Sequence, residues 1–195
     1  MTDTDKYSLG YYPAYAELAG RIGPAGHVLE VGVAYGGSLR MWRELFPDGL
    51  VAGADLDPGC TWPDGTVQIL AAQDSPYLAH RAAEISPGGW DLIVDDASHV
   101  GELSARTFTL LWPLVRPGGW YVLEDWPVAF TEPFASSGLF GGSSMLRLAQ
   151  SWIRELEPVP GAADLGGYPA APTGSGISEL WYRFGQAMVH KAAET

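Results

Sequence analysis

Two short apolar stretches of the chain each run into a pair of adjacent carboxylates. The first stretch ends at Asp95 and Asp96, and the second ends at Glu124 and Asp125. Short apolar runs bounded by glycine indicate buried strands, so we expect these acids at the ends of strands. Carboxylates held close together raise one another's pKa and destabilise a site unless a cation joins them. The pattern therefore predicts a bound cation where the two strands end.

Three of the four acids are the predicted metal ligands. The two strands should be neighbours in a sheet, which would let Asp96, Glu124 and Asp125 meet. Three carboxylates without a thiolate suit a hard divalent ion such as Mg²⁺ in a shell of oxygen atoms. The alternative is a set of solvated loop acids. We expect Asp95 to face a cofactor instead, although it could exchange roles with Asp96.

A histidine follows Asp96 three residues later in the chain. An alcohol is a poor nucleophile near pH 7, and a metal ion that binds its oxygen makes the proton easier to remove. Histidine changes its protonation state near neutral pH, so His99 is the predicted general base. Two alternatives stay open for His99, namely a fourth metal ligand or a structural histidine in a helix cap or the core.

Expected strands and helices alternate along the chain. This alternation indicates an α/β fold, with a Rossmann-like, doubly wound sheet that is mostly parallel and ends in a C-terminal antiparallel hairpin. Right-handed crossovers place the carboxyl ends of parallel strands on one edge, where open sheets bind ligands. The expected strands are residues 27–33, 50–54, 66–71, 90–94, 120–123, 177–184 and 186–190.

We expect a single domain over residues 1–195, because this length suits one hydrophobic core. Residues 1–6 are expected to fray, and residues 1–22 to include a helical cap over the site. Residues 127–176 are rich in glycine, proline and small residues, and they are the expected variable lid or substrate region.

The chain is acidic, with 23 Asp and Glu residues against 11 Lys and Arg and a formal net charge of −12. Nucleic acids and anionic membranes need a basic face, so neither is an expected partner. No apolar run reaches membrane-spanning length. The single cysteine, Cys60, cannot form an internal disulfide, which favours a reducing cytoplasm as the compartment.

A glycine-rich loop follows the first expected strand. Gly32, Gly36 and Gly37 would let the backbone approach a ligand closely. A dinucleotide site likewise combines a glycine loop with an acid at the end of the second strand, here Asp55. However, Glu30 beside the loop would repel a pyrophosphate and would favour an amino group or a sulfonium. The loop therefore points away from a dinucleotide.

These motifs resemble those of a known enzyme family. The glycine loop with Asp55 resembles the class I S-adenosylmethionine-dependent methyltransferases. The motifs at residues 95–99 and 118–125 look like those of a metal-dependent sugar O-methyltransferase branch from antibiotic pathways, which includes mycinamicin-type enzymes and proteins labelled cephalosporin hydroxylases. The resemblance covers residues 5–126 and the closing hairpin. It implies a seven-stranded sheet, S-adenosyl-L-methionine and Mg²⁺ or a similar cation as cofactors, and methyl transfer to a hydroxyl group.

The resemblance also implies the same three metal ligands and a set of cofactor-binding residues. Asp55 would hold the ribose, although it could be a solvated turn acid, and Gln73 and Ser75 could cap a helix instead of binding adenine. The full set of implied cofactor-binding residues is Glu30, Gly32, Tyr35, Ser38, Asp55, Gln73, Asp74, Ser75 and Asp95.

Aromatic residues could contact the acceptor of the methyl group. Trp126, Phe130 and Phe134 could stack on a sugar ring or form the core of a lid, and Tyr11 could close over the site. The expected acceptor is a glycosylated or polyhydroxylated small molecule of natural-product metabolism. A cyclisation or rearrangement enzyme, a non-catalytic partner subunit and a dehydrogenase stay open as other functions. A homo-oligomer also stays open.

Overall fold

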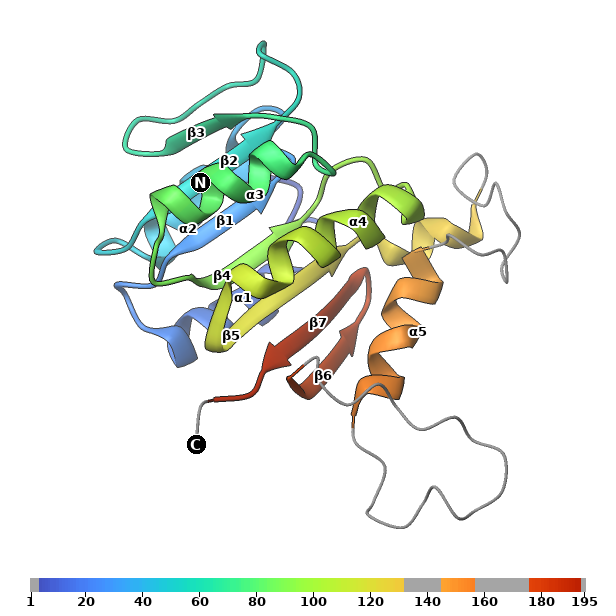
Figure 1. The fold of residues 1–195 in the computed structure, drawn as a ribbon. Coiled ribbons are helices and arrows are strands. Elements are labelled where there is room, and N and C mark those ends of the chain that lie inside the picture. The colour runs from blue at the N-terminus through green and yellow to red at the C-terminus, as the bar shows by residue number, and fades with distance from the viewer. Residues whose placement is uncertain (1–3, 132–144, 157–175, 194–195) are drawn as a thin grey trace, which may run out of the picture.

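The computed structural model describes residues 4–131, 145–156 and 176–193 (Figure 1). Its centre is a seven-stranded sheet made of β1 (Val28–Val31), β2 (Val51–Asp55), β3 (Val67–Leu70), β4 (Trp90–Asp95), β5 (Val115–Glu124), β6 (Ile177–Arg183) and β7 (Gln186–Lys191). The strand order is β3-β2-β1-β4-β5-β7-β6. Strands β1 to β5 are parallel, whereas β7 is antiparallel to both β5 and β6. The predicted doubly wound sheet with a C-terminal hairpin is confirmed.

Helices cover both faces of the sheet (Figure 1). They are α1 (Tyr12–Ile22), α2 (Gly37–Leu45), α3 (Pro76–Ile85), α4 (Gly101–Leu111) and α5 (Met145–Glu155), with the short 3-10 helices η1 (Trp112–Leu114) and η2 (Trp126–Phe130). One core layer packs under α1 and α2, and the other under α3, α4 and α5. Within the described ranges, no helix is both long and apolar enough to cross a membrane.

Two details of the elements differ from the expectations. Strand β5 begins at Val115, earlier than the expected strand, because Val115 already pairs with Trp90 before the register shifts between Trp90 and Leu92. The segment 117–119 is therefore an irregularity within a strand rather than a turn before it. At the start of α2, Gly36 is the N-cap, with a left-handed φ of 69°.

Candidate functional site

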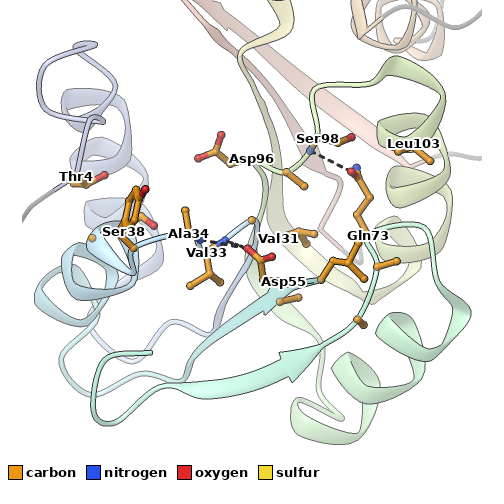
Figure 2. Close-up of a pocket in the computed structure, with 18 of the residues that line it drawn as sticks. Thr4, Val31, Val33, Ala34, Ser38, Asp55, Gln73, Asp96, Ser98 and Leu103 are labelled. Carbon is orange, nitrogen blue, oxygen red and sulfur yellow. Dashed lines mark hydrogen bonds between the residues drawn. The ribbon is translucent and has the colours of Figure 1, made fainter. Parts of the chain in front are cut away.

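A cavity of about 800 Å³ opens where the parallel strands β1 to β4 end (Figure 2). This volume lies in the range of small-molecule sites, which is about 300–1,000 Å³. The cavity walls come from the loops after these strands, from α4 and from the N-terminal segment of residues 4–6. Six of the predicted cofactor residues line it, namely Gly32, Tyr35, Ser38, Asp55, Gln73 and Asp74.

Asp55 holds the glycine loop that follows β1. Its Oδ2 accepts hydrogen bonds from the main-chain N–H groups of Val33 (2.7 Å) and Ala34 (3.3 Å), and its Oδ1 accepts from that of Asp57 (2.9 Å). Burial disfavours the ionised carboxylate, but these donors outweigh burial and lower the pKa of Asp55 below its usual value. Carboxylate oxygens have spare lone pairs, so Asp55 can also accept from ligand hydroxyls.

Gln73 joins the loops that follow β3 and β4. Its Oε1 accepts a hydrogen bond from the main-chain N–H of Ser98 at 3.1 Å, and its Nε2 donates to the hydroxyl of Thr107 at 3.1 Å (Figure 2 shows the first). Gln73 thus lines the cavity and also fixes its wall. Ser75 takes its alternative role, since its hydroxyl caps α3 by accepting from the N–H of Tyr77 at 3.2 Å.

Glu30 and Asp95 are fully buried and lie outside the cavity lining. Oε2 of Glu30 accepts a hydrogen bond from the hydroxyl of Ser38 at 2.5 Å. Asp95 accepts from the hydroxyl of Tyr121 at 3.2 Å, and burial raises the pKa of Asp95 to about 7. Because successive residues of an extended chain point to opposite sides, Asp96 rather than Asp95 lines the cavity. Asp96 also lies in the candidate metal cluster and Asp95 does not, so the two residues have not simply exchanged roles.

Three non-glycine residues near the cavity have a left-handed backbone. Their φ angles are 47° for Ala34, 55° for His99 and 55° for Asp125. They follow the ends of β1, β4 and β5, respectively. This conformation costs an L-residue roughly 1–2 kcal/mol, so the surrounding contacts must hold it in place. Strain of this kind concentrates at functional sites, which marks these strand ends as the candidate reactive region.

The acids that follow β4 and β5 meet around a buried lysine. Nζ of Lys6 donates to Oδ2 of Asp96 at 2.7 Å and to Oε2 of Glu124 at 2.6 Å, and it lies 3.3 Å from Oε1 of Glu30. Burial disfavours the ammonium, but the carboxylates, Glu124 first, raise the pKa of Lys6 well above its usual value. The expectation that residues 1–6 fray is wrong for Lys6, because these ion pairs hold it inside the protein.

Two tyrosines at the start of α1 donate to the same group of acids. The hydroxyl of Tyr15 donates to Glu124, and that of Tyr11 donates to Oδ1 of Asp125 at 2.5 Å. Burial and the nearby carboxylates raise the pKa of both tyrosines, so both hydroxyls stay protonated. Tyr11, predicted to contact an acceptor, is 2 % exposed, and its hydroxyl is engaged by Asp125.

Side chains capable of binding a metal meet at the solvent-accessible side of this group of acids. Ligand atoms of Asp96, His99 and Asp125 lie within 4.8 Å of one another, and Nε2 of His99 is 3.7 Å from Oδ2 of Asp125. Glu124, the third predicted carboxylate ligand, lies deeper, with its side chain only 2 % exposed. The structure therefore brings His99 into the predicted metal cluster and places Glu124 behind it.

The charge balance of the cluster fits a divalent cation. Glu30, Asp96 and Glu124 surround the ammonium of Lys6, and Asp125 lies beside Asp96 and His99. Burial raises the pKa of Glu30 and of Glu124, and a divalent ion beside these acids would favour their ionised forms. The carboxylate oxygens suit Mg²⁺ and similar hard ions, whereas the imidazole of His99 is a ligand that transition metals prefer.

The aromatic residues predicted to contact an acceptor are only partly placed. The ring of Trp126 lies 6.2 Å from that of Phe130 and 6.5 Å from that of Tyr182 in β6. Phe130 is 51 % exposed, so its ring is open to a ligand. Phe134 lies outside the described residues, as does most of the predicted lid region 127–176.

Sequence reasoning missed several residues of the site. It assigned no role in the site to Lys6, to Tyr15 or to Leu103, and Leu103 lines the cavity. Leu56 also lines the cavity while its side chain is 70 % exposed. An apolar residue placed between Asp55 and Asp57 was the available signal, because a solvated turn does not need one.

No family model matches the chain, but the chain is similar to curated proteins and to solved structures. L-olivosyl-oleandolide 3-O-methyltransferase from Streptomyces antibioticus is 34% identical over 160 residues, which is 78% of this chain and 39% of the relative. Demethylmacrocin O-methyltransferase from Streptomyces fradiae is 35% identical over 141 residues, which is 67% of this chain and 35% of the relative. The chain thus spans less than half the length of both relatives.

A solved structure of the MycE methyltransferase from the mycinamycin biosynthetic pathway, in complex with Mg and SAH, superimposes with a TM-score of 0.74. It is 29% identical in sequence, and the match covers 93% of this chain and 49% of MycE. The chain is a homologue of these O-methyltransferases. In this methyltransferase homologue, the cavity and the acid cluster lie side by side and share Lys6 and Asp96.

Proposed function

We propose that this chain is the catalytic part of an S-adenosyl-L-methionine-dependent, divalent-metal-assisted O-methyltransferase that acts on a sugar hydroxyl of a natural product. The observation that carries the proposal is the gathering of Asp96, His99 and Asp125 within 4.8 Å, next to a cavity of cofactor size. The curated relatives support it, since they are O-methyltransferases, two of which are named for substrates that carry an olivosyl or a rhamnosyl group.

The cavity is the proposed site of S-adenosyl-L-methionine. Asp55 would accept hydrogen bonds from the ribose hydroxyls, and Leu56 and Leu103 would offer apolar surface to the adenine. Tyr35 and Ser38 would line the methionine end. Glu30, buried behind Ser38, would favour the positive charge of the amino group and the sulfonium through the low-dielectric interior.

The acid cluster is the proposed site of Mg²⁺ or a similar ion. Asp96 and Asp125 would be ligands, and Glu124 would bind the ion or hold Asp96 in place from below. When bound, the ion would lower the pKa of an acceptor hydroxyl. Nε2 of His99, which lies 3.7 Å from Oδ2 of Asp125, would take the proton of that hydroxyl.

The proposal also covers the acceptor of the methyl group and the assembly of the protein. MycE has been solved in complex with Mg, SAH and mycinamycin VI, and the chain covers 49% of that protein. By analogy we propose a glycosylated small molecule as acceptor. The exposed ring of Phe130 is the candidate for stacking on its sugar, and the parts of the relatives beyond this chain would complete the acceptor site or join copies into an oligomer.

Calorimetry combined with a turnover assay tests the proposal. We expect the wild type and Asp96→Ala to bind S-adenosyl-L-homocysteine with similar affinity, because the proposed contacts to the cofactor come from other lining residues, such as Asp55 and Leu103. Methylation of a panel of demethyl macrolide glycosides should need Mg²⁺ and should be lost in Asp96→Ala. Asp57→Ala, an exposed acid outside the cluster, is the matched control.

The outcomes separate the proposal from its alternatives. Turnover that a chelator leaves unchanged would overturn the role of the metal. Binding of S-adenosyl-L-methionine without its consumption, while the acceptor changes structure, would instead indicate a cyclisation or rearrangement. Failure to bind S-adenosyl-L-homocysteine at all would leave only a non-catalytic role for the fold.

A further inference from the structure

Lys6 is a positive charge buried between the cavity and the acid cluster. Its side chain is 1 % exposed, and three carboxylate oxygens, from Glu30, Asp96 and Glu124, lie within 3.3 Å of Nζ. Two of these contacts, to Asp96 and Glu124, are hydrogen bonds, and the contact with Glu30 is an ion pair. Each of the three groups that Nζ contacts is a carboxylate, so Lys6 acts on the site through these carboxylates.

The partners of Lys6 include two of the three carboxylates predicted to bind a metal. Glu124 is held on both oxygens, with Oε2 accepting from Lys6 and Oε1 from Tyr15. Asp96 gives Oδ2 to Lys6 while its side chain stays 23 % exposed toward the cavity. The ammonium thus holds the carboxylate of Glu124 in the interior and holds that of Asp96 where it stays accessible from the cavity.

The charge of Lys6 also bears on any cation that binds beside it. A divalent ion on Asp96 would share that carboxylate with the ammonium, and two cations on one carboxylate repel each other. Even at the dielectric constant of water, repulsion between a monovalent and a divalent charge a few Å apart changes affinity by about tenfold. The number of negative charges in a site is also what tunes its affinity for divalent ions.

We propose that Lys6 is a positioning residue with an electrostatic function. It is a built-in cation that orients Asp96 and Glu124 and lowers the affinity of the acid cluster for its divalent ion. This inference rests on the proposed metal site. Lys6 belongs to the N-terminal segment of residues 4–6, which is not part of the sheet. By this inference, the segment controls the affinity of the site for the ion.

Calorimetric titration of the purified chain with MgCl₂ tests this inference. Lys6→Met keeps the length of the side chain and removes the charge, so Mg²⁺ should bind about tenfold more tightly. Lys6→Arg keeps the charge and should stay within about threefold of the wild type. Lys191→Met is the control for general damage, because Lys191 donates to the main-chain carbonyls of Trp112 and Val115, away from the cluster.

A second variant keeps the test decisive if Lys6→Met does not fold. Lys6→Met/Glu30→Gln removes one positive and one negative charge together, so it should fold more readily and bind Mg²⁺ with nearly wild-type affinity. Affinity that is unchanged or weaker in folded Lys6→Met would overturn the inference, as would tighter binding by the double variant or by Lys6→Arg. An absence of Mg²⁺ binding by the wild type would instead overturn the proposed function on which the inference rests.

Discussion

A Cβ atom on Gly32 would overlap the main-chain carbonyl oxygen of Asp96. The loops that follow β1 and β4 are therefore in backbone contact, and the contact brings the glycine loop of the cofactor cavity against the residue that begins the acid cluster. Gly32 also has a φ of 101°, a value that L-residues with a side chain rarely adopt. The two halves of the site are joined through this one position.

Gly32→Ala should consequently disturb both halves of the site. The left-handed backbone alone costs alanine roughly 1–2 kcal/mol, and the overlap with backbone adds to this, so we expect a loss of at least about 2 kcal/mol in the free energy of unfolding. Gly20→Ala is the control, since a Cβ there meets nothing within 4 Å in helix α1, and it should stabilise by roughly 0.5–1 kcal/mol. Urea unfolding of both variants measures the difference, and equal stability would contradict the prediction.

Gln73→Met should weaken the connection between the loops after β3 and β4. The variant leaves the N–H of Ser98 and the hydroxyl of Thr107 without the amide partner, which should cost about 1–3 kcal/mol of stability. It should also weaken the binding of S-adenosyl-L-homocysteine. Gln68→Met, an exposed position of β3, should change stability by no more than about 0.5 kcal/mol. Similar effects of the two substitutions would show that the link is unimportant.

The fold could be predicted because its signals are local. Apolar runs bounded by glycine marked the strands, and Ser75 followed by Pro76 marked the start of α3, where the serine does cap the helix. The beginning of β5 at Val115 could not be predicted from such local signals. It depends on pairing with Trp90 across a shift of register, and a pairing partner distant in sequence leaves no local pattern.

The candidate site was predictable on the strands and unpredictable elsewhere. Asp96 and Asp125 were marked by their position after apolar runs. Lys6 was not, because its hydrogen bond to Glu124 joins residues 118 positions apart, and a lone lysine in a polar terminus usually is solvated. The spacing of the glycines also could not show that position 32 needs glycine because the loop after β4 lies against it.

Stability should depend on pH through His27, at the opposite end of the sheet. Burial, with a smaller effect of Arg116, lowers the pKa of His27 from the ordinary value of 6.5. The unfolded chain therefore binds this proton more readily than the folded one. The contribution is fully present above pH 6.5 and is lost as the pH falls through the lower folded pKa.

Thermal unfolding of His27→Gln at several pH values checks this sign. The melting temperature of the wild type relative to His27→Gln should be higher at pH 7.5 than at pH 5.5. Gln68→Met, at an exposed position of β3 without a titrating side chain, should change the melting temperature equally at both pH values. A difference between the wild type and His27→Gln that is constant over this range would contradict the assigned direction of the pKa shift.

Tyr11→Phe should weaken the metal site without touching a metal ligand. The hydroxyl of Tyr11 donates to Oδ1 of Asp125, and a Cβ on Gly185, in the turn between β6 and β7, would overlap that hydroxyl. The turn therefore packs closely against Tyr11, and glycine at position 185 leaves room for the hydroxyl beside Asp125. Loss of a partner that orients a ligand typically costs about 10–100-fold in metal affinity, so Tyr11→Phe should bind Mg²⁺ at least about tenfold more weakly.

This effect is opposite in sign to that of Lys6→Met, although both residues contact carboxylates of one cluster. The hydroxyl of Tyr11 is neutral and only orients Asp125, whereas the ammonium of Lys6 repels the incoming ion. Tyr77→Phe, at an exposed position of α3, should leave Mg²⁺ affinity unchanged in the same titration. Tighter binding by Tyr11→Phe would mean that Asp125 is better placed without its hydrogen bond, and the role assigned to the turn at Gly185 would then be wrong.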